Sequence, residues 1–298
     1  MPYFQARDGA RLHYLDIGRG TPNVMLHAFG MRAAFWLPYV LPYVLTNRFV
    51  MLDFRGFGGS RHVRLTRADA LGQNADDVQD LLAHLKLDNP RMVGFSIGAA
   101  SAFAYQQRYG FDHLRAYMHV DQTPCIANKP DWRWGLMGDD NEAAFERGRA
   151  LLQAFDGVDH ALPFKQLPPE LQEQFWAWFA EFFRSCFGSI WWRLVLGAGG
   201  VRYGRILLEP NNWSAYLRCV ASFIEQDYDF RDSLRSVRTP LWVLVGRSSQ
   251  VFPAQGQRHI ARLVPGARVH EFRGAGHVIP VEAATRFTYT LGRFLART

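Results

Sequence analysis

Ser96 is the residue of this chain whose sequence context most clearly indicates a chemical role. It stands in the middle of the pattern Gly-Phe-Ser-Ile-Gly at residues 94–98, directly after an apolar run. The two glycines allow a strand to turn sharply into a helix without Cβ clashes, so the hydroxyl is exposed at the start of that helix. Amide donors and the helix dipole favour developing negative charge there. The pattern therefore indicates a nucleophilic serine, although a tight turn with a capping serine produces the same five residues.

A serine hydroxyl is a poor nucleophile at neutral pH and needs a base within hydrogen-bond reach. His277 suits this role best among the ten histidines, because it follows a predicted strand and lies in the glycine-rich segment 274–277. Such a loop can project the imidazole into a site at the end of a sheet. A carboxylate must then hold the imidazole in the tautomer that accepts the serine proton.

The motifs, in their order along the chain, resemble the α/β-hydrolase superfamily. They are L-H-A-F-G at 26–30, D-F-R-G-F-G-G-S at 53–60, G-F-S-I-G at 94–98 and G-A-G-H-V-I-P-V-E at 274–282. Ala28 departs from the glycine that is usual in the first motif. The resemblance covers almost the whole chain and implies an α/β-hydrolase fold: a mostly parallel eight-stranded sheet flanked by helices, with a helical cap inserted after strand 6. It also implies that the backbone N–H groups of Phe29 and Ile97 form the oxyanion hole, and that His27 is a structural hydrogen-bonding residue.

Strand and helix patterns alternate along both ends of the chain, which predicts a mostly parallel sheet with right-handed crossovers. A hairpin turn is expected at Asp8-Gly9. Small residues at 97–109 predict a helix that can pack close to the sheet. The expected strands of the sheet are the apolar runs at 23–27, 49–53, 91–93, 117–120, 241–245 and 267–271.

The alternation stops between about Asp121 and Asn212, where the sequence is helical and unusually aromatic. We therefore expect a cap at 122–212 and a core domain at 1–121 and 213–298, with the Gly-rich stretch 197–200 as a loop within the cap. The aromatic residues at 175–183 cover more than one helical face, so some of them should face the core and line an apolar pocket. The candidate substrate-binding residues are Trp132, Trp134, Trp176, Trp178 and Phe182.

The acid that orients the histidine departs from the usual pattern. Most members of the superfamily carry it after the seventh strand, where this chain has Ser249. Asp121 is the strongest replacement, because it ends the predicted sixth strand at the sheet edge where catalytic loops gather. Asp229 and Asp232 are rival carboxylates, and a turn-capping role for Asp121 is the structural alternative.

These residues predict a serine hydrolase that cleaves an ester, lactone or thioester bond of an apolar small molecule through an acyl-enzyme, with Ser96, His277 and Asp121 as the catalytic triad. A serine at the elbow disfavours haloalkane dehalogenases and epoxide hydrolases, whose nucleophile is a carboxylate. Three alternatives stay open: a cofactor-free oxygenase on the same fold, a carbon-carbon bond hydrolase, and a catalytically degraded binding module. We find no metal-binding spacing and expect no cofactor.

Composition narrows the range of partners. The net charge of +7 is spread along the chain without a nucleic-acid-binding motif, so we expect no nucleic-acid partner. No apolar run is long enough to span a membrane, and the first residues lack an apolar signal core, which favours a cytoplasmic protein. Cys125, Cys186 and Cys219 lie far apart and are expected to be free, buried thiols. A homodimer is left open.

Overall fold

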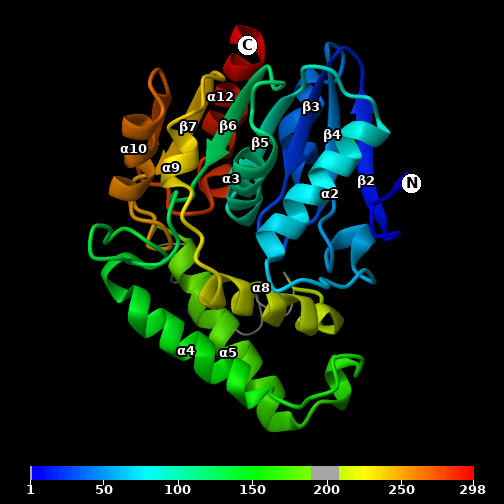
Figure 1. Ribbon diagram of the computed structural model, residues 1–298, viewed down its shortest axis with the longest axis vertical. Coiled ribbons are helices and arrows are strands. Elements are labelled where there is room, and N and C mark those ends of the chain that lie inside the picture. Colours follow the sequence, from blue (N-terminus) through cyan, green and yellow to red (C-terminus); the bar gives the residue numbers. More distant parts are fainter. Residues whose placement is uncertain (1, 189–207) are drawn as a thin grey trace.

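A computed structural model describes residues 2–188 and 208–298, and the glycine-rich loop expected at 197–200 lies outside these residues. Eight strands form one sheet in the order β1-β2-β4-β3-β5-β6-β7-β8 (Figure 1). β1 and β2 are antiparallel to their neighbours, and the pairs from β4 to β8 are parallel. The strands are Tyr3–Gln5 (β1), Arg11–Gly18 (β2), Thr21–Leu26 (β3), Asn47–Leu52 (β4), Arg91–Phe95 (β5), Ala116–Val120 (β6), Leu241–Gly246 (β7) and Arg268–Phe272 (β8).

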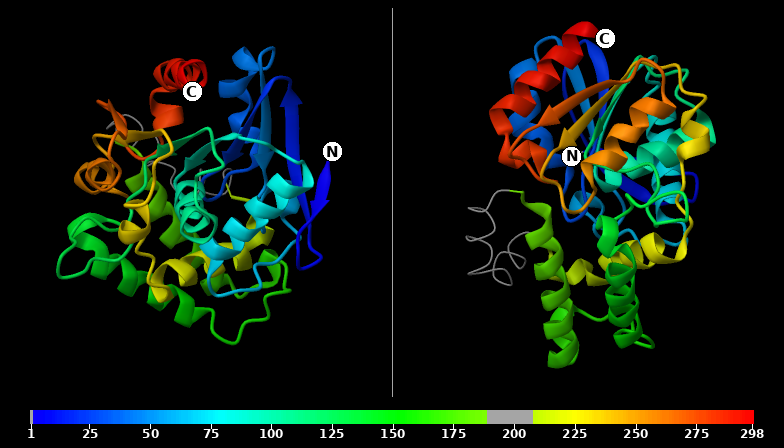
Figure 2. Two further views of the ribbon diagram at one scale, coloured as in Figure 1. Left: turned by 45° about the horizontal axis from the view of Figure 1, so that its top comes forward. Right: turned by 90° about the vertical axis from the view of Figure 1, so that its left-hand side faces the viewer.

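The central strands are apolar because the sheet is covered on both faces. Every residue of β5, β6 and β7 is buried, which is typical of parallel strands between two helical layers. Figure 2 shows helices on both sides of the sheet. One layer holds α2 (Ala70–His84), α3 (Ile97–Tyr109), α9 (Arg231–Leu234) and α10 (Ala254–Leu263), and the other holds α1 (Leu37–Val40), α11 (Ile279–Glu282) and α12 (Ala284–Arg297). The predicted α/β-hydrolase fold is therefore confirmed.

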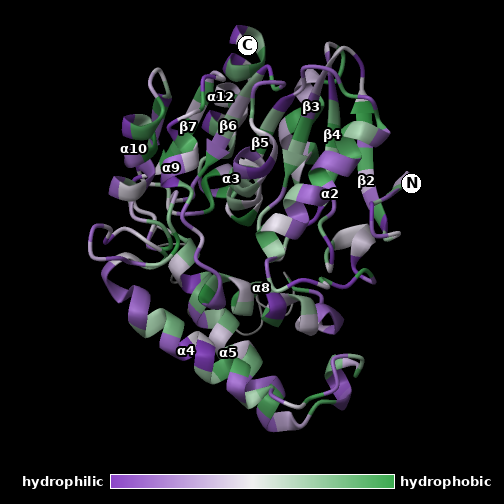
Figure 3. Cartoon of the chain, viewed as in Figure 1, coloured by the Kyte–Doolittle hydropathy of each residue, from purple (hydrophilic) through white to green (hydrophobic). Residues whose placement is uncertain are grey.

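Three further helices lie together at one end of the sheet (Figure 1). They are α4 (Asn141–Ala154), α5 (Pro169–Cys186) and α8 (Trp213–Glu225). Hydrophilic and hydrophobic residues alternate along α4 and α5, as expected for helices with one buried face (Figure 3). Within the described residues, no helix is both long enough and apolar enough to cross a membrane.

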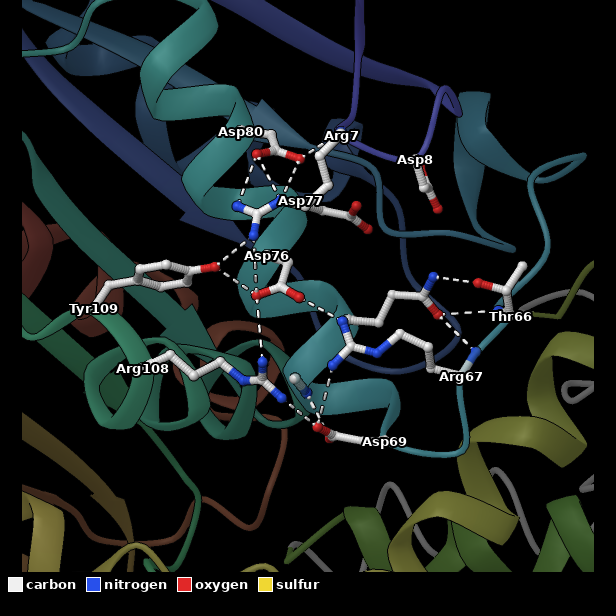
Figure 4. Close-up of polar contacts among 12 residues, drawn as sticks. Arg7, Asp8, Thr66, Arg67, Asp69, Asp76, Asp77, Asp80, Arg108 and Tyr109 are labelled. Atoms are coloured by element: carbon white, nitrogen blue, oxygen red, sulfur yellow. Dashed lines mark hydrogen bonds and ion pairs between the residues drawn. The ribbon is translucent and has the colours of Figure 1, made fainter.

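A polar network on the outer surface ties the N-terminal hairpin to α2 and α3 (Figure 4). Arg7 donates to both carboxylate oxygens of Asp80 and to the hydroxyl of Tyr109. That hydroxyl donates to Asp76, which also pairs with Arg67 from the loop before α2. Arg67 thus belongs to an ion-pair network that fixes the loop before α2.

Candidate active site

Ser96 occupies a strained turn between β5 and α3. Its φ of 54° and ψ of −119° lie outside the regions that L-residues favour. Crowding explains the flanking glycines: a Cβ on Gly94 would stand 2.8 Å from the Cα of Ala99, and a Cβ on Gly98 would collide with the carbonyl of Leu26. The sequence pattern therefore produces the sharp strand-to-helix turn that exposes a hydroxyl at the end of the sheet.

His277 and Asp121 extend a continuous hydrogen-bond chain from this hydroxyl. The Nε2 of His277 lies 2.8 Å from Oγ of Ser96, and its Nδ1 lies 2.8 Å from Oδ1 of Asp121. All three side chains are buried. Because an ionised carboxylate only accepts hydrogen bonds, Nδ1 carries the proton and donates it to Asp121. Nε2 is then free to accept the proton of Ser96.

Asp121 is held in place by its own backbone and by a ring of donors. It directly follows β6 and has a φ of 43°, in the left-handed region that few non-glycine residues adopt. Its Oδ2 accepts the N–H of Gly246 at 2.8 Å, and its Oδ1 accepts the hydroxyl of Ser249 at 2.8 Å. Burial raises the pKa of Asp121, while the hydrogen bonds from His277 and Ser249 lower this pKa, and the net direction is upward.

Phe29 and Ile97, whose backbone amides are the expected oxyanion hole, line the same cavity as Ser96. Ile97 is the first residue of α3, so its N–H has no partner within the helix. Phe29 lies in the loop after β3, and this loop is fixed by His27. Nε2 of His27 accepts the N–H of Phe54 at 3.1 Å, so its Nδ1 donates to the carbonyl of Ala28 at 2.8 Å. Burial lowers the pKa of His27, which keeps this neutral arrangement.

An apolar cavity opens onto Ser96. Its walls come from α4 and the loop before it, α5, α8, the loop after β7, the loop after β3 and the turn from β5 to α3. Apart from the Ser96 hydroxyl, every described lining side chain is apolar or a thiol. The lining residues are Phe29, Ser96, Ile97, Leu136, Met137, Ala144, Phe145, Trp178, Phe182, Cys219, Val220, Phe223, Ile224, Val251 and Phe252.

The structure places only two of the five candidate pocket aromatics, Trp178 and Phe182, on this cavity. The other three are absent from its described lining. Trp132 packs edge to face against Trp134 and against His259 of α10, Trp134 packs against the same His259 at a tilted angle, and Trp132 donates its indole N–H to the carbonyl of Cys125. Trp176 is buried on the other side of α5, against Phe164 and Phe175. These three tryptophans therefore pack against other residues, and for Trp176 the spacing alone does not show which face of α5 meets the cavity.

The wall formed by α8 was not expected from the sequence. Val220, Phe223 and Ile224 come from this helix, which was assigned to the core domain. Their spacing of three and four residues was a usable signal for one apolar helical face. What the pattern does not show is that α8 passes beneath the strand ends instead of covering the sheet, as Figure 1 shows.

The rival carboxylates serve other contacts. Asp229 pairs with Arg231 and Lys129 and forms an isolated β-bridge with Cys125, and these two cations hold its pKa well below the usual range. Asp232 is exposed and lies near Arg235. Across residues 2–188 and 208–298 we find no cluster of three His, Cys, Asp or Glu side chains arranged to hold a metal ion.

The chain belongs to the α/β-hydrolase fold family, whose family model matches residues 24–284. It is similar to the AB hydrolase superfamily protein YisY of Bacillus subtilis, with 22% identity over 98% of both chains. It is also similar to the non-heme chloroperoxidase CPO-A1 of Kitasatospora aureofaciens, with 25% identity over 94% of this chain and 93% of the relative. Further relatives are named as a pimeloyl-[acyl-carrier protein] methyl ester esterase and a 2-hydroxymuconate semialdehyde hydrolase.

Among solved structures, an esterase from Exiguobacterium antarcticum superimposes with a TM-score of 0.77 at 20% identity, covering 99% of this chain and 98% of the esterase. This likeness shows the fold. The family and its relatives together support a hydrolase and leave open which bond it cleaves.

Proposed function

We propose that this protein is a serine hydrolase that cleaves an ester, lactone or thioester bond of an apolar small molecule through an acyl-enzyme on Ser96. The observation that carries the proposal is the hydrogen-bond chain Ser96–His277–Asp121, which ends on a hydroxyl at the mouth of an apolar cavity. The cap, proposed at 122–212, closes this cavity over the strand ends.

The proposed reaction begins when Nε2 of His277 removes the proton from Ser96 as Oγ attacks the carbonyl carbon. Asp121 stabilises the imidazolium that forms and keeps its orientation. The carbonyl oxygen becomes an oxyanion that the N–H groups of Phe29 and Ile97 stabilise. His277 then gives its proton to the leaving oxygen or sulfur, and the carbon-oxygen or carbon-sulfur bond breaks. A water molecule, deprotonated by the same imidazole, releases the acid and restores the serine.

The composition of the cavity supports an uncharged acyl group. No cationic side chain stands on its described lining, so no group there would compensate the negative charge of a carboxylate on the acyl group of the substrate. Aromatic and aliphatic walls such as Trp178, Phe145 and Ile224 stabilise an alkyl or aryl group by removing it from water. This argues against substrates that carry a charge on the acyl side.

Steady-state hydrolysis of a p-nitrophenyl ester series, from acetate to decanoate, together with matched lactones, tests the proposal. We expect higher kcat/KM for medium-length acyl groups than for acetate, and a loss of several orders of magnitude in the variant Ser96→Ala, because triad members act as a unit. Retention of folding in Ser96→Ala is checked by circular dichroism. Near wild-type hydrolysis by this variant would rule out the acyl-enzyme.

The same preparation separates the alternatives. A cofactor-free oxygenase would consume dissolved oxygen with a hydroxyquinolone-like substrate and release no p-nitrophenol. A carbon-carbon bond hydrolase would cleave a vinylogous diketone faster than any ester. A binding module would do none of these and would not react with a fluorophosphonate.

A further inference from the structure

Gly148 stands in the interior of α4 without a backbone reason for glycine. It is buried, and its φ lies outside the range that L side chains avoid. Glycine in a helix interior destabilises the helix relative to alanine, because it gives up more backbone freedom on folding. The other buried residues of this face, such as Phe145 and Leu151, are large. We therefore infer that a neighbouring group leaves no room for a side chain at position 148.

Ile224 of α8 fills that space. A Cβ built on Gly148 would lie 2.5 Å from Cδ1 of Ile224, and 3.6 Å from Cγ1 of both Ile224 and Val220. The first distance is too short for two carbon atoms, whereas the second is ordinary contact. The terminal methyl group of one flexible side chain thus lies directly against the backbone of α4.

This same side chain is part of the cavity wall. Ile224 and Val220 line the cavity from α8, and Ala144 and Phe145 line it from α4, one turn before Gly148. Ile224 therefore lies between Gly148 and the cavity that opens onto Ser96. Because Cδ1 of Ile224 packs against α4, this methyl group stays out of the cavity, and a Cβ at position 148 would force it to move.

We propose that Gly148 determines how deep the acyl-binding cavity is, by allowing Ile224 to recede against α4. Gly148 is then a specificity-determining residue that acts through Ile224, without touching the substrate. The inference rests on the proposed function in one respect, namely that the acyl group of the substrate occupies this cavity.

The test compares Gly148→Ala, Ile224→Val and the double variant. Ile224→Val removes Cδ1, the atom with which the new methyl group would collide, so the double variant restores the packing volume. We expect Gly148→Ala to lower the ratio of kcat/KM for decanoate over butanoate, by about fourfold for each methylene that the shortened cavity excludes. Ile224→Val should raise this ratio, and the double variant should return it towards the wild-type value.

Displacement of a bound anilinonaphthalene dye by n-alkanols of increasing length gives a readout that does not require catalysis. The alkanol length of tightest binding should shorten in Gly148→Ala and recover in the double variant. If the wild type hydrolyses no ester, the proposed function fails, while the alkanol series still decides the inference. An unchanged length profile in Gly148→Ala, or an equal loss for all chain lengths that Ile224→Val does not rescue, would overturn the inference. Thermal unfolding of each variant shows whether α4 stays folded.

Discussion

At the scale of single residues, Ser249 and Asp121 share one task. The hydroxyl of Ser249 lies where most members of the family carry the acid, and it donates to the same Oδ1 that accepts Nδ1–H of His277. Ser249 cannot supply a charge, but its hydrogen bond lowers the pKa of Asp121 against the effect of burial. We infer that Asp121, directly after β6, supplies the negative charge beside His277. Ser249, in the loop after β7, helps to stabilise that charge.

Asp121→Asn should lower kcat by on the order of 10³–10⁴, because the amide favours the wrong imidazole tautomer and leaves the imidazolium without a counter-charge. Ser249→Ala should cost far less. Ser249→Asp in the Asp121→Asn background should recover part of the activity. Stopped assays with the preferred ester measure all three. A harmless Asp121→Asn would remove Asp121 from the mechanism.

The pH dependence of kcat/KM gives an independent test of the hydrogen bond from Ser249 to Asp121. Loss of the Ser249 hydrogen bond removes an interaction that lowers the pKa of Asp121, so this carboxylate should take up a proton at higher pH. Activity requires the ionised carboxylate, so the acid limb of kcat/KM should move to higher pH in Ser249→Ala. A limb that stays in place or moves to lower pH would show that Ser249 does not act through Asp121.

At the scale of elements, the end of α5 is tied to the loop that carries the histidine. The N–H of His277 donates to the carbonyl of Cys186 at 2.9 Å. The carboxylate of Glu282 accepts the N–H of Gly276 at 2.7 Å and that of Gly188 at 2.9 Å. One acidic side chain thus bridges the catalytic loop and the helix that contributes Trp178 and Phe182 to the cavity.

Glu282→Gln should weaken this bridge, because an amide has one accepting oxygen and its NH₂ group faces an N–H donor. We expect kcat to fall by about tenfold with little change in KM, since a small displacement of a catalytic group affects mainly the transition state. Glu271→Gln is the matched control, because Glu271 pairs with Arg258 on the outer side of β8. Equal kinetics for the two variants would show that Glu282 does not position the loop.

The strands and helices of the core were largely predictable, because each carries a local signal. The small-residue run at 97–109 is α3, and the apolar runs correspond to β3 to β8. The cavity wall was less predictable. Trp176 and Trp178 are two residues apart on one amphipathic helix, yet Trp176 packs against Phe164 and Trp178 lines the cavity. That difference depends on how α5 is rotated against its neighbours, which is a property of tertiary packing.

At the scale of the whole molecule, a buried histidine beneath the site makes stability depend on pH. His119 is fully buried in β6, where it stacks on Phe103 and lies between the hydroxyl of Tyr117 and the carbonyl of Gln122. Burial lowers its pKa from 6.5 to about 3. The folded state therefore holds His119 neutral, while the unfolded chain takes up a proton below about pH 6.5.

Because the folded pKa is depressed, the stabilising effect is complete above pH 6.5 and is lost as the pH falls towards 3, by at most about 1.4 kcal/mol per pH unit. His119→Gln should reduce the pH dependence of the free energy of unfolding, even though the variant is less stable at pH 7. Urea denaturation at pH 7, 6 and 5 measures this slope, with the exposed His62→Gln as control. The same slope in all three proteins would contradict the assignment.

During turnover, the proposed mechanism requires Ser96 to carry the acyl group of the substrate. Acid quenching within milliseconds of mixing the protein with a medium-chain p-nitrophenyl ester, followed by intact and peptide mass spectrometry, tests it most directly. We predict a mass increase equal to one acyl group on the peptide that contains Ser96, and none in Ser96→Ala. Rapid hydrolysis of the ester with no adduct on Ser96, and with activity retained in Ser96→Ala, would contradict the account.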